Sequence, residues 1–203
     1  MKFYLSSYEL GNKTEELRKL ASKGKIGYIP NARDFAGADP ERRLQRNESD
    51  MNSLRQLGLE VELIDLKEYF GKQKELKDKL VELGAIFISG GNVFVLRQAM
   101  KLSGLDEILK ELLNTDFLYA GYSAAGCVLA SDLRGMELVD PLDTPYKEQK
   151  EILWEGLGLV DFRFMPHWDS NHPESADIDK EIAYCKENNI TYKAIRDGEV
   201  III

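Results

Sequence analysis

Short apolar segments alternate with longer amphipathic segments along the first two thirds of the chain. The short ones are rich in branched and aromatic residues, and several are apolar almost throughout. They lie at 2–6, 25–30, 60–65, 84–89 and 117–121. This pattern predicts parallel strands that are buried on both faces of a sheet.

The longer segments carry apolar residues three and four positions apart, which is typical of helices with one buried face. They lie at 13–23, 41–57, 73–83 and 93–113, the last with a break at Ser103–Gly104. Strands and helices that alternate in this way predict right-handed crossovers and a doubly wound sheet.

The last third is less regular. A strand, a helix and a second strand are predicted over 159–166, 175–188 and 190–196. The apolar tail, 199–203, follows an Asp-Gly pair at 197–198, and Asp-Gly is a strong hairpin-turn signal. We therefore expect the tail to pair with 190–196 in a hairpin.

Length and composition narrow the function classes. The 203 residues are 43% hydrophobic and predict a single α/β domain over 1–203. A net charge of −8 without a basic stripe disfavours nucleic acid and anionic membranes as partners. No apolar run approaches the roughly 20 residues of a membrane helix, and the N-terminus lacks a signal-peptide pattern. We expect a cytoplasmic protein.

Cysteine and histidine are scarce. The two cysteines, Cys127 and Cys185, are far apart and match no metal-ligand spacing. The chain also has only two histidines, so few side chains of the types that bind zinc are present. We expect no structural zinc and no cofactor.

The segment FLYAGYSAAGCVLA, at 117–130, contains the first candidate for catalysis. A strand, Gly121, Ser123 and a run of small residues predict a nucleophile elbow, the sharp strand-to-helix turn that exposes a serine. Ala125 stands where the usual elbow has its second glycine, and Gly126 follows one residue later. Two alternatives stay open: Ser123 as a helix cap only, or Cys127 as a thiolate nucleophile.

A second candidate segment is Gly90–Gly91–Asn92, which follows the predicted strand GAIFIS. Glycines there let backbone N–H groups face a cleft, and a helix N-terminus favours an anion. Both this segment and Ser123 end strands at the same edge of a parallel sheet, where open α/β folds bind ligands.

A serine nucleophile needs a base and an orienting acid. The base is His167 or His172, and we favour His167 because it follows the strand-like FRFMP. Several acids are open on sequence: Asp132, Asp140, Asp169 and Asp197. Asp197 has the distinctive location, on the tight turn that closes the predicted hairpin.

Four segments together resemble the peptidase E (aspartyl dipeptidase) family of serine peptidases, which is related to cyanophycinase. They are IFISGGNVFVL (86–96), YAGYSAAGCVLA (119–130), MPHWD (165–169) and IRDG (195–198). The resemblance covers almost the whole chain. It implies a three-layer α/β/α sandwich with a mainly parallel sheet, similar to class I glutamine amidotransferases.

The resemblance also implies roles for individual residues. Ser123 is then the nucleophile, His167 the base and Asp197 the acid, where the best-known members have Glu. Gly91 and Ala124 would offer oxyanion N–H groups. Gly90, Asn92 and Tyr122 would bind substrate.

One feature of the family is missing. Dipeptidase members carry an arginine between the histidine and the late acid, thought to bind an aspartyl carboxylate. Here the matching segment, 174–179, holds acidic and small residues. We therefore expect no strong preference for N-terminal aspartyl dipeptides.

These observations favour a serine peptidase that hydrolyses small peptides through an acyl-enzyme, as a monomer or homodimer. One alternative is an inactive or regulatory binding member of the same fold. Another is an esterase of the α/β-hydrolase type that uses Asp140 and His167. The absence of a strong strand between the elbow and about residue 159 disfavours the esterase.

Overall fold

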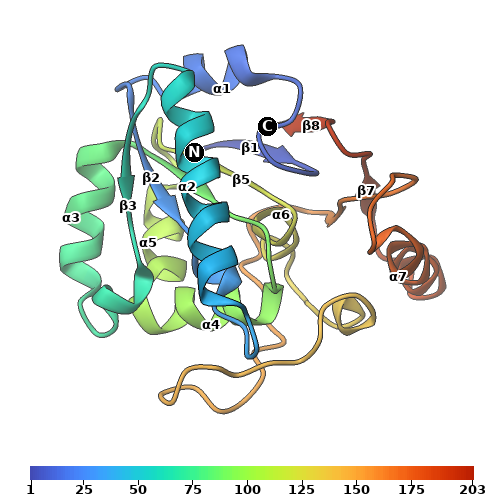
Figure 1. Cartoon of the computed structure of the whole chain (residues 1–203). Coiled ribbons are helices and arrows are strands. Elements are labelled where there is room, and N and C mark those ends of the chain that lie inside the picture. Colours follow the sequence, from blue (N-terminus) through green and yellow to red (C-terminus); the bar gives the residue numbers. More distant parts are fainter.

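A six-stranded sheet forms the centre of the molecule (Figure 1). The structure is a computed structural model that describes residues 1–203. The strand order is β3-β2-β4-β5-β1-β8, and only β8 runs antiparallel to its neighbour. The strands are β1 (Lys2–Ser6), β2 (Lys25–Ile29), β3 (Glu60–Leu63), β4 (Ala85–Ile88), β5 (Leu118–Tyr122) and β8 (Val200–Ile202). The predicted mainly parallel α/β sheet is confirmed.

Helices cover both faces of this sheet. One face packs on α1 (Thr14–Leu20) and α2 (Pro40–Gln56), whose Leu17 and Met51 share a core cluster with Tyr28 of β2. The opposite face packs on four helices that share a larger cluster with alternate strand residues such as Ile86. They are α3 (Gln73–Leu83), α4 (Val93–Ser103), α5 (Leu105–Leu112) and α6 (Ala124–Cys127). The three-layer sandwich is therefore confirmed.

The remaining elements are short or lie to one side. A two-stranded parallel sheet joins β6 (Arg163–Met165) and β7 (Tyr192–Ala194), and α7 (Ser175–Glu187) connects them. Figure 1 shows α7 and β7 projecting away from the main sheet. Three short 3₁₀ helices complete the chain: η1 (Asn31–Arg33), η2 (Leu66–Tyr69) and η3 (Met136–Leu138).

The predicted hairpin between the tail and 190–196 is wrong. β7 pairs with β6, whereas β8 pairs with β1, Leu5 lying opposite Ile201. The turn itself is real, because Gly198 has φ 89° and Glu199 N–H donates to Arg196 O. The turn carries the chain from the small sheet to the open edge of the large one, where β1 supplies unpaired backbone groups.

The strand register brings three chain turns to one edge of the sheet. Ser6 of β1 lies opposite Tyr122 of β5, and Ile88 of β4 lies opposite Gly121. Since these strands are parallel and end level, the residues that follow them meet at the carboxyl edge, as open α/β sheets require for a binding site.

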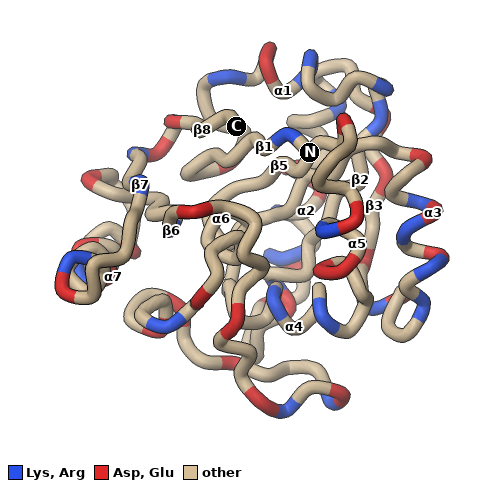
Figure 2. The backbone as a smooth tube through the Cα atoms, turned by 180° about the vertical axis from the view of Figure 1, so that it is seen from behind, with Lys and Arg blue, Asp and Glu red and all other residues tan.

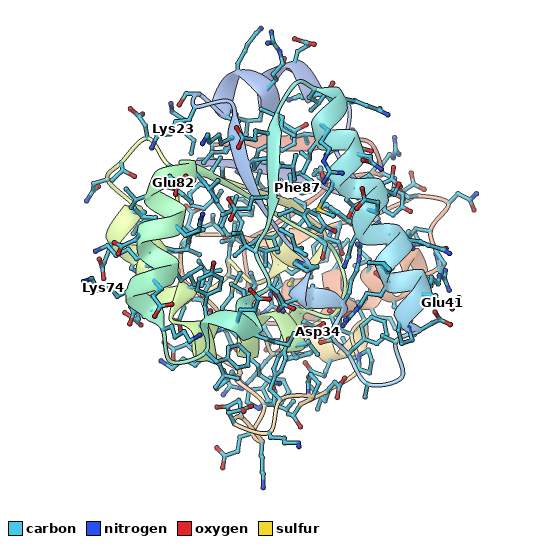
Figure 3. The ribbon with its side chains drawn as sticks, turned by 60° about the vertical axis from the view of Figure 1, so that its left-hand side comes forward. Lys23, Asp34, Glu41, Lys74, Glu82 and Phe87 are labelled. Atoms are coloured by element: carbon cyan, nitrogen blue, oxygen red, sulfur yellow. The ribbon has the colours of Figure 1, made fainter.

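The outer helices have charged solvent faces. Figure 2 shows acidic and basic residues interspersed along α3 and α7. In Figure 3, Lys74 and Glu82 of α3 point outward, whereas Phe87 of β4 lies in the interior, where it is fully buried. None of the helices combines the length and apolar character that a membrane span requires.

Candidate active site

Ser123 lies on the sharp turn between β5 and α6. Its backbone has φ 49° and ψ −111°, a conformation that costs a non-glycine residue of the order of 1–3 kcal/mol. The Ser123 carbonyl accepts the N–H groups of Gly126 and Cys127, but its side chain caps no helix N–H. A strained serine with a free hydroxyl is the expected geometry of a nucleophile elbow.

Close packing explains why the elbow glycine is displaced by one residue. A methyl group on Gly121 would lie 2.5 Å from Ile88 O and 2.6 Å from the Ala125 Cβ. A methyl group on Gly126 would lie 2.4 Å from the ring of Phe164 in β6. Gly121 therefore leaves room for the methyl group of Ala125. The second glycine of the elbow, Gly126, lies where β6 packs against α6.

His167 follows Pro166, the first residue after β6. Its ring is buried, and its Nδ1 lies 2.6 Å from Asp197 Oδ1. Burial lowers the pKa of His167, while the hydrogen bond to Asp197 acts in the opposite direction. The ring is therefore neutral at pH 7, and Asp197 fixes the tautomer with the proton on Nδ1 and the lone pair on Nε2.

Ser7, which follows β1, links the histidine to the carboxylate. Its hydroxyl oxygen accepts the His167 N–H at 2.8 Å, and its O–H donates to Asp197 Oδ1 at 2.8 Å. Asp197 N–H in turn donates to Ser170 Oγ at 2.8 Å. The sequence analysis did not single out Ser7; its signal was its position just past a strand, at the edge that holds Ser123.

A cleft of about 480 Å³ opens at this edge of the sheet. Ser123, His167, Gly90, Gly91 and Tyr122 all line it. Ser123 Oγ and His167 form no hydrogen bond in this structure, although both side chains face the same cleft. Such a bond is often long or poorly aligned before substrate binds.

Backbone N–H groups next to Ser123 have no acceptor within the protein. They belong to Gly90, Gly91 and Ala124. Gly91 has φ 145°, and a Cβ there would lie 2.4 Å from Ala32 O, so only glycine fits the turn. A Cβ on Gly90 would lie 3.2 Å from the Ser123 Cβ, which shows how close the two turns approach.

Asn92, which the resemblance implies as a substrate-binding residue, is not among the residues that line this cleft. Its side chain accepts the N–H groups of Phe94 and Val95 and donates to Pro141 O. Asn92 is the N-cap of α4, a role for which Asn is preferred. Its hydrogen-bonding capacity is used within the fold.

Tyr122 lines the cleft with its ring but uses its hydroxyl inside the protein. The hydroxyl donates to Asp50 at 3.0 Å and accepts from Arg33. Arg33 also pairs with Asp50 at 2.8 Å. This buried network supports the wall of the cleft.

Four arginines line the cleft, all from the segment that contains η1 and the start of α2. Arg33 is held by its buried network, and Arg43 pairs with Asp34. Arg42 and Arg46 are exposed and have no ion-pair partner. A cation was expected between His167 and Asp197, so this group was not predicted; the spacing of Arg42 and Arg46, one helical turn apart, was the available signal.

Two more residues adjoin the His167 ring. The ring of His172 stacks on it with centroids 3.7 Å apart and an interplanar angle of 8°. Glu174 Oε2 lies 3.9 Å from His167 Nε2. His172 touches no carboxylate side chain that would orient it as a base, since its Nδ1 accepts only the Glu174 backbone N–H.

The other acid candidates lie in other interactions. Asp132 and Asp169 pair with exposed arginines. Asp140 accepts the Val93 N–H at the start of α4, and burial raises its pKa to about 7. The esterase arrangement, with Asp140 orienting His167, is therefore not formed.

Cys127 does not offer a thiolate. It is buried in α6, and its thiol lies 3.5 Å from Phe164 O. Burial raises the pKa of this thiol well above its ordinary value. Buried thiols of this kind are inert.

Comparisons with known proteins agree on one family. The chain is 33% identical over 124 residues to an uncharacterized peptidase of Listeria monocytogenes, covering 61% of this chain and 58% of that protein. It is 30% identical over 125 residues to peptidase E of Streptomyces coelicolor, covering 59% of this chain and 49% of that protein. The matches thus span only about half the length of these relatives.

A similar fold occurs in the crystal structure of a candidate peptidase E protein from Listeria monocytogenes EGD-e. The TM-score is 0.73 at 22% identity, over 100% of this chain and 97% of the other. The sequence profile of peptidase family S51 matches residues 6–203. On this match across nearly its whole length, the chain belongs to peptidase family S51.

Proposed function

We propose that this protein is a serine peptidase that hydrolyses small peptides, with Ser123, His167 and Asp197 as its triad. The observation that carries the proposal is the 2.6 Å contact between Asp197 and His167, which lines the same cleft as the strained Ser123. Family membership supports the peptidase class.

The triad divides the chemistry in a defined way. Ser123 Oγ attacks the scissile carbonyl while His167 Nε2 takes the hydroxyl proton. His167 then donates that proton to the leaving amine, which leaves an acyl group on Ser123. A water molecule, deprotonated by the same Nε2, releases the acyl group. Asp197 holds the tautomer and stabilises the imidazolium in both steps.

The oxyanion formed in each step needs hydrogen-bond donors that already point to it. The free N–H groups of Gly91 and Ala124 supply them in this proposal, and the N–H of Gly90 lies beside them. Loss of one such donor costs an enzyme about 100- to 1000-fold in rate.

The arginines of α2 line the cleft and indicate which kind of substrate it could bind. A carboxylate in a cleft needs cationic partners to replace its hydration, and Arg42 and Arg46 are free to provide them. We therefore propose that the cleft takes a short peptide whose N-terminal residue has an acidic side chain at this end. This revises the expectation that N-terminal aspartyl dipeptides are not strongly preferred.

A dipeptide panel tests the function and its specificity together. Asp-Leu, Asn-Leu and Lys-Leu should be compared for wild type and Arg46→Gln, with Arg55→Gln as the control. Arg55 is exposed on the same helix, outside the cleft, and pairs with Glu48. We expect Arg46→Gln to lower kcat/KM for Asp-Leu about tenfold and Arg55→Gln to leave it unchanged. Equal loss for all three dipeptides would contradict a contact with the aspartyl side chain, because it would place the contact at the C-terminal carboxylate that all three share. No turnover of any peptide would favour an inactive binding protein.

A further inference from the structure

Three potential metal ligands meet at the cleft. They are His167, His172 and Glu174, here called the His-His-Glu cluster. One ligand atom from each lies within 4.8 Å of the other two, and all three residues line the cleft. The triad uses only one member of the cluster, which leaves the other two without an assigned role.

The separation between the His167 and Glu174 ligand atoms is slightly larger than in a bound zinc site. Tetrahedral zinc with bonds of about 2.0–2.1 Å places its ligand atoms about 3.3 Å apart. His167 Nε2 and Glu174 Oε2 are 3.9 Å apart, so a small movement of an exposed side chain closes the gap. Glu174 lies at the start of α7 with 41% of its side chain exposed, and it pairs with no Lys or Arg.

His167 is already oriented as a zinc ligand. Its Nδ1 faces the Asp197 carboxylate, so the Nε2 lone pair points into the cleft. A carboxylate behind the histidine fixes ring orientation and raises ligand basicity at zinc sites. His172 stacks on this ring, and its Nδ1 accepts the Glu174 backbone N–H, which leaves Nε2 as its ligand atom. Because an imidazole binds a metal in its ring plane, the His172 ring must rotate out of the stack to share an ion with His167.

We propose that the His-His-Glu cluster binds one Zn²⁺ and that the bound ion inhibits the peptidase reversibly. Two imidazoles and one carboxylate are a donor set that zinc accepts with its fourth position open to the cleft. The inhibition rests on the proposed function, because the lone pair that binds zinc is the one that would take the Ser123 proton. Zinc binding itself does not depend on Ser123. This open site differs from the structural zinc that the sequence analysis disfavoured.

Direct binding tests the site without relying on activity. Zinc titration in competition with a chromophoric chelator should give one site per chain in wild type and in Ser123→Ala. His172→Ala and Glu174→Gln should each weaken binding at least tenfold. Asp179→Asn, an exposed carboxylate on the same helix, should bind as wild type does. The proposal would be overturned if wild type had no stoichiometric zinc site, or if both cluster variants bound zinc with wild-type affinity. Circular dichroism checks that each variant is folded.

Activity separates the two parts of the inference. On the best dipeptide of the panel, zinc should inhibit wild type at the concentrations at which it binds, and EDTA should restore the rate. In His172→Ala, inhibition should require at least tenfold more zinc, whatever its basal rate. If the enzyme hydrolyses the dipeptide and binds zinc but is not inhibited by it, the proposed inhibition is wrong. Zinc binding to a protein that hydrolyses no peptide would leave the site supported and the proposed function wrong.

Discussion

At the scale of single residues, the site depends on groups that hold His167 rather than on His167 alone. Asp197 fixes the ring, and Ser7 ties the backbone of His167 to that carboxylate. His167 itself has φ 60°, so its backbone is held in the left-handed region by these contacts. Several hydrogen bonds that share partners therefore fix the geometry of the base together.

Asp197→Asn should lower kcat by about a thousandfold or more, because the amide favours the wrong tautomer. The base works only when neutral, so activity is lost as pH falls through the pKa of His167. Burial lowers that pKa, which places the acid limb of wild type below the ordinary histidine value of about 6.5. Removing the Asp197 charge should move the limb lower still. A pH–kcat/KM profile with an unshifted limb and an unchanged plateau would refute this role.

Ser7→Ala should lower kcat about tenfold with little change in KM, because two hydrogen bonds that position the base and acid are lost. The cost in stability should be about 1–2 kcal/mol. Ser6→Ala is the matched control: Ser6 is also buried, but its hydroxyl bonds to Glu9 O. Urea unfolding and steady-state kinetics on both variants separate the roles. Equal kcat values in the two variants would show that Ser7 acts on stability only.

At the scale of elements, the elbow is set by how closely α6 approaches its neighbours. Gly121 and Gly126 leave no room for a side chain, one against β4 and the other against β6. The strand, the short helix and β6 thus fix both Ser123 and the start of the His167 loop. The displaced glycine of the sequence pattern follows from this packing rather than from a defective elbow.

Gly126→Ala should destabilise the fold by about 1–3 kcal/mol, because the new methyl group overlaps the Phe164 ring. The strain should reach Ser123 and His167 together, since both flank the contact. We expect a lower Tm and a fall in kcat. Phe164→Leu in the same chain should recover part of the loss by freeing space. A Gly126→Ala variant with the Tm and kcat of wild type would contradict the packing account.

At the scale of the whole molecule, the order and type of the main elements could be predicted because strands and helices differ in apolar period. The parallel register then brought Ser123 and the Gly90–Gly91 turn to one edge, as expected. The hairpin failed because an Asp-Gly turn specifies local geometry but not which strand is next. Likewise, no sequence pattern shows that α2 brings Arg42 and Arg46 over the cleft.

Partner choice among candidate acids could not be settled by position in the chain either. Asp197 had the distinctive location, but only the fold shows that it meets His167, whereas Asp140 accepts the Val93 N–H at the start of α4. Asn92 illustrates the opposite case, since a residue of a functional segment serves the helix start.

Hydrolysis of the best dipeptide of the panel by wild type and Ser123→Ala is the most direct test of the account. Ser123→Ala should lose at least about a thousandfold in kcat/KM. His167→Ala should lose as much, and the double variant should be no worse, because the residues act as one unit. Cys127→Ala should retain wild-type activity. A Ser123→Ala enzyme with more than a tenth of the wild-type kcat/KM would contradict the claim that Ser123 is the nucleophile.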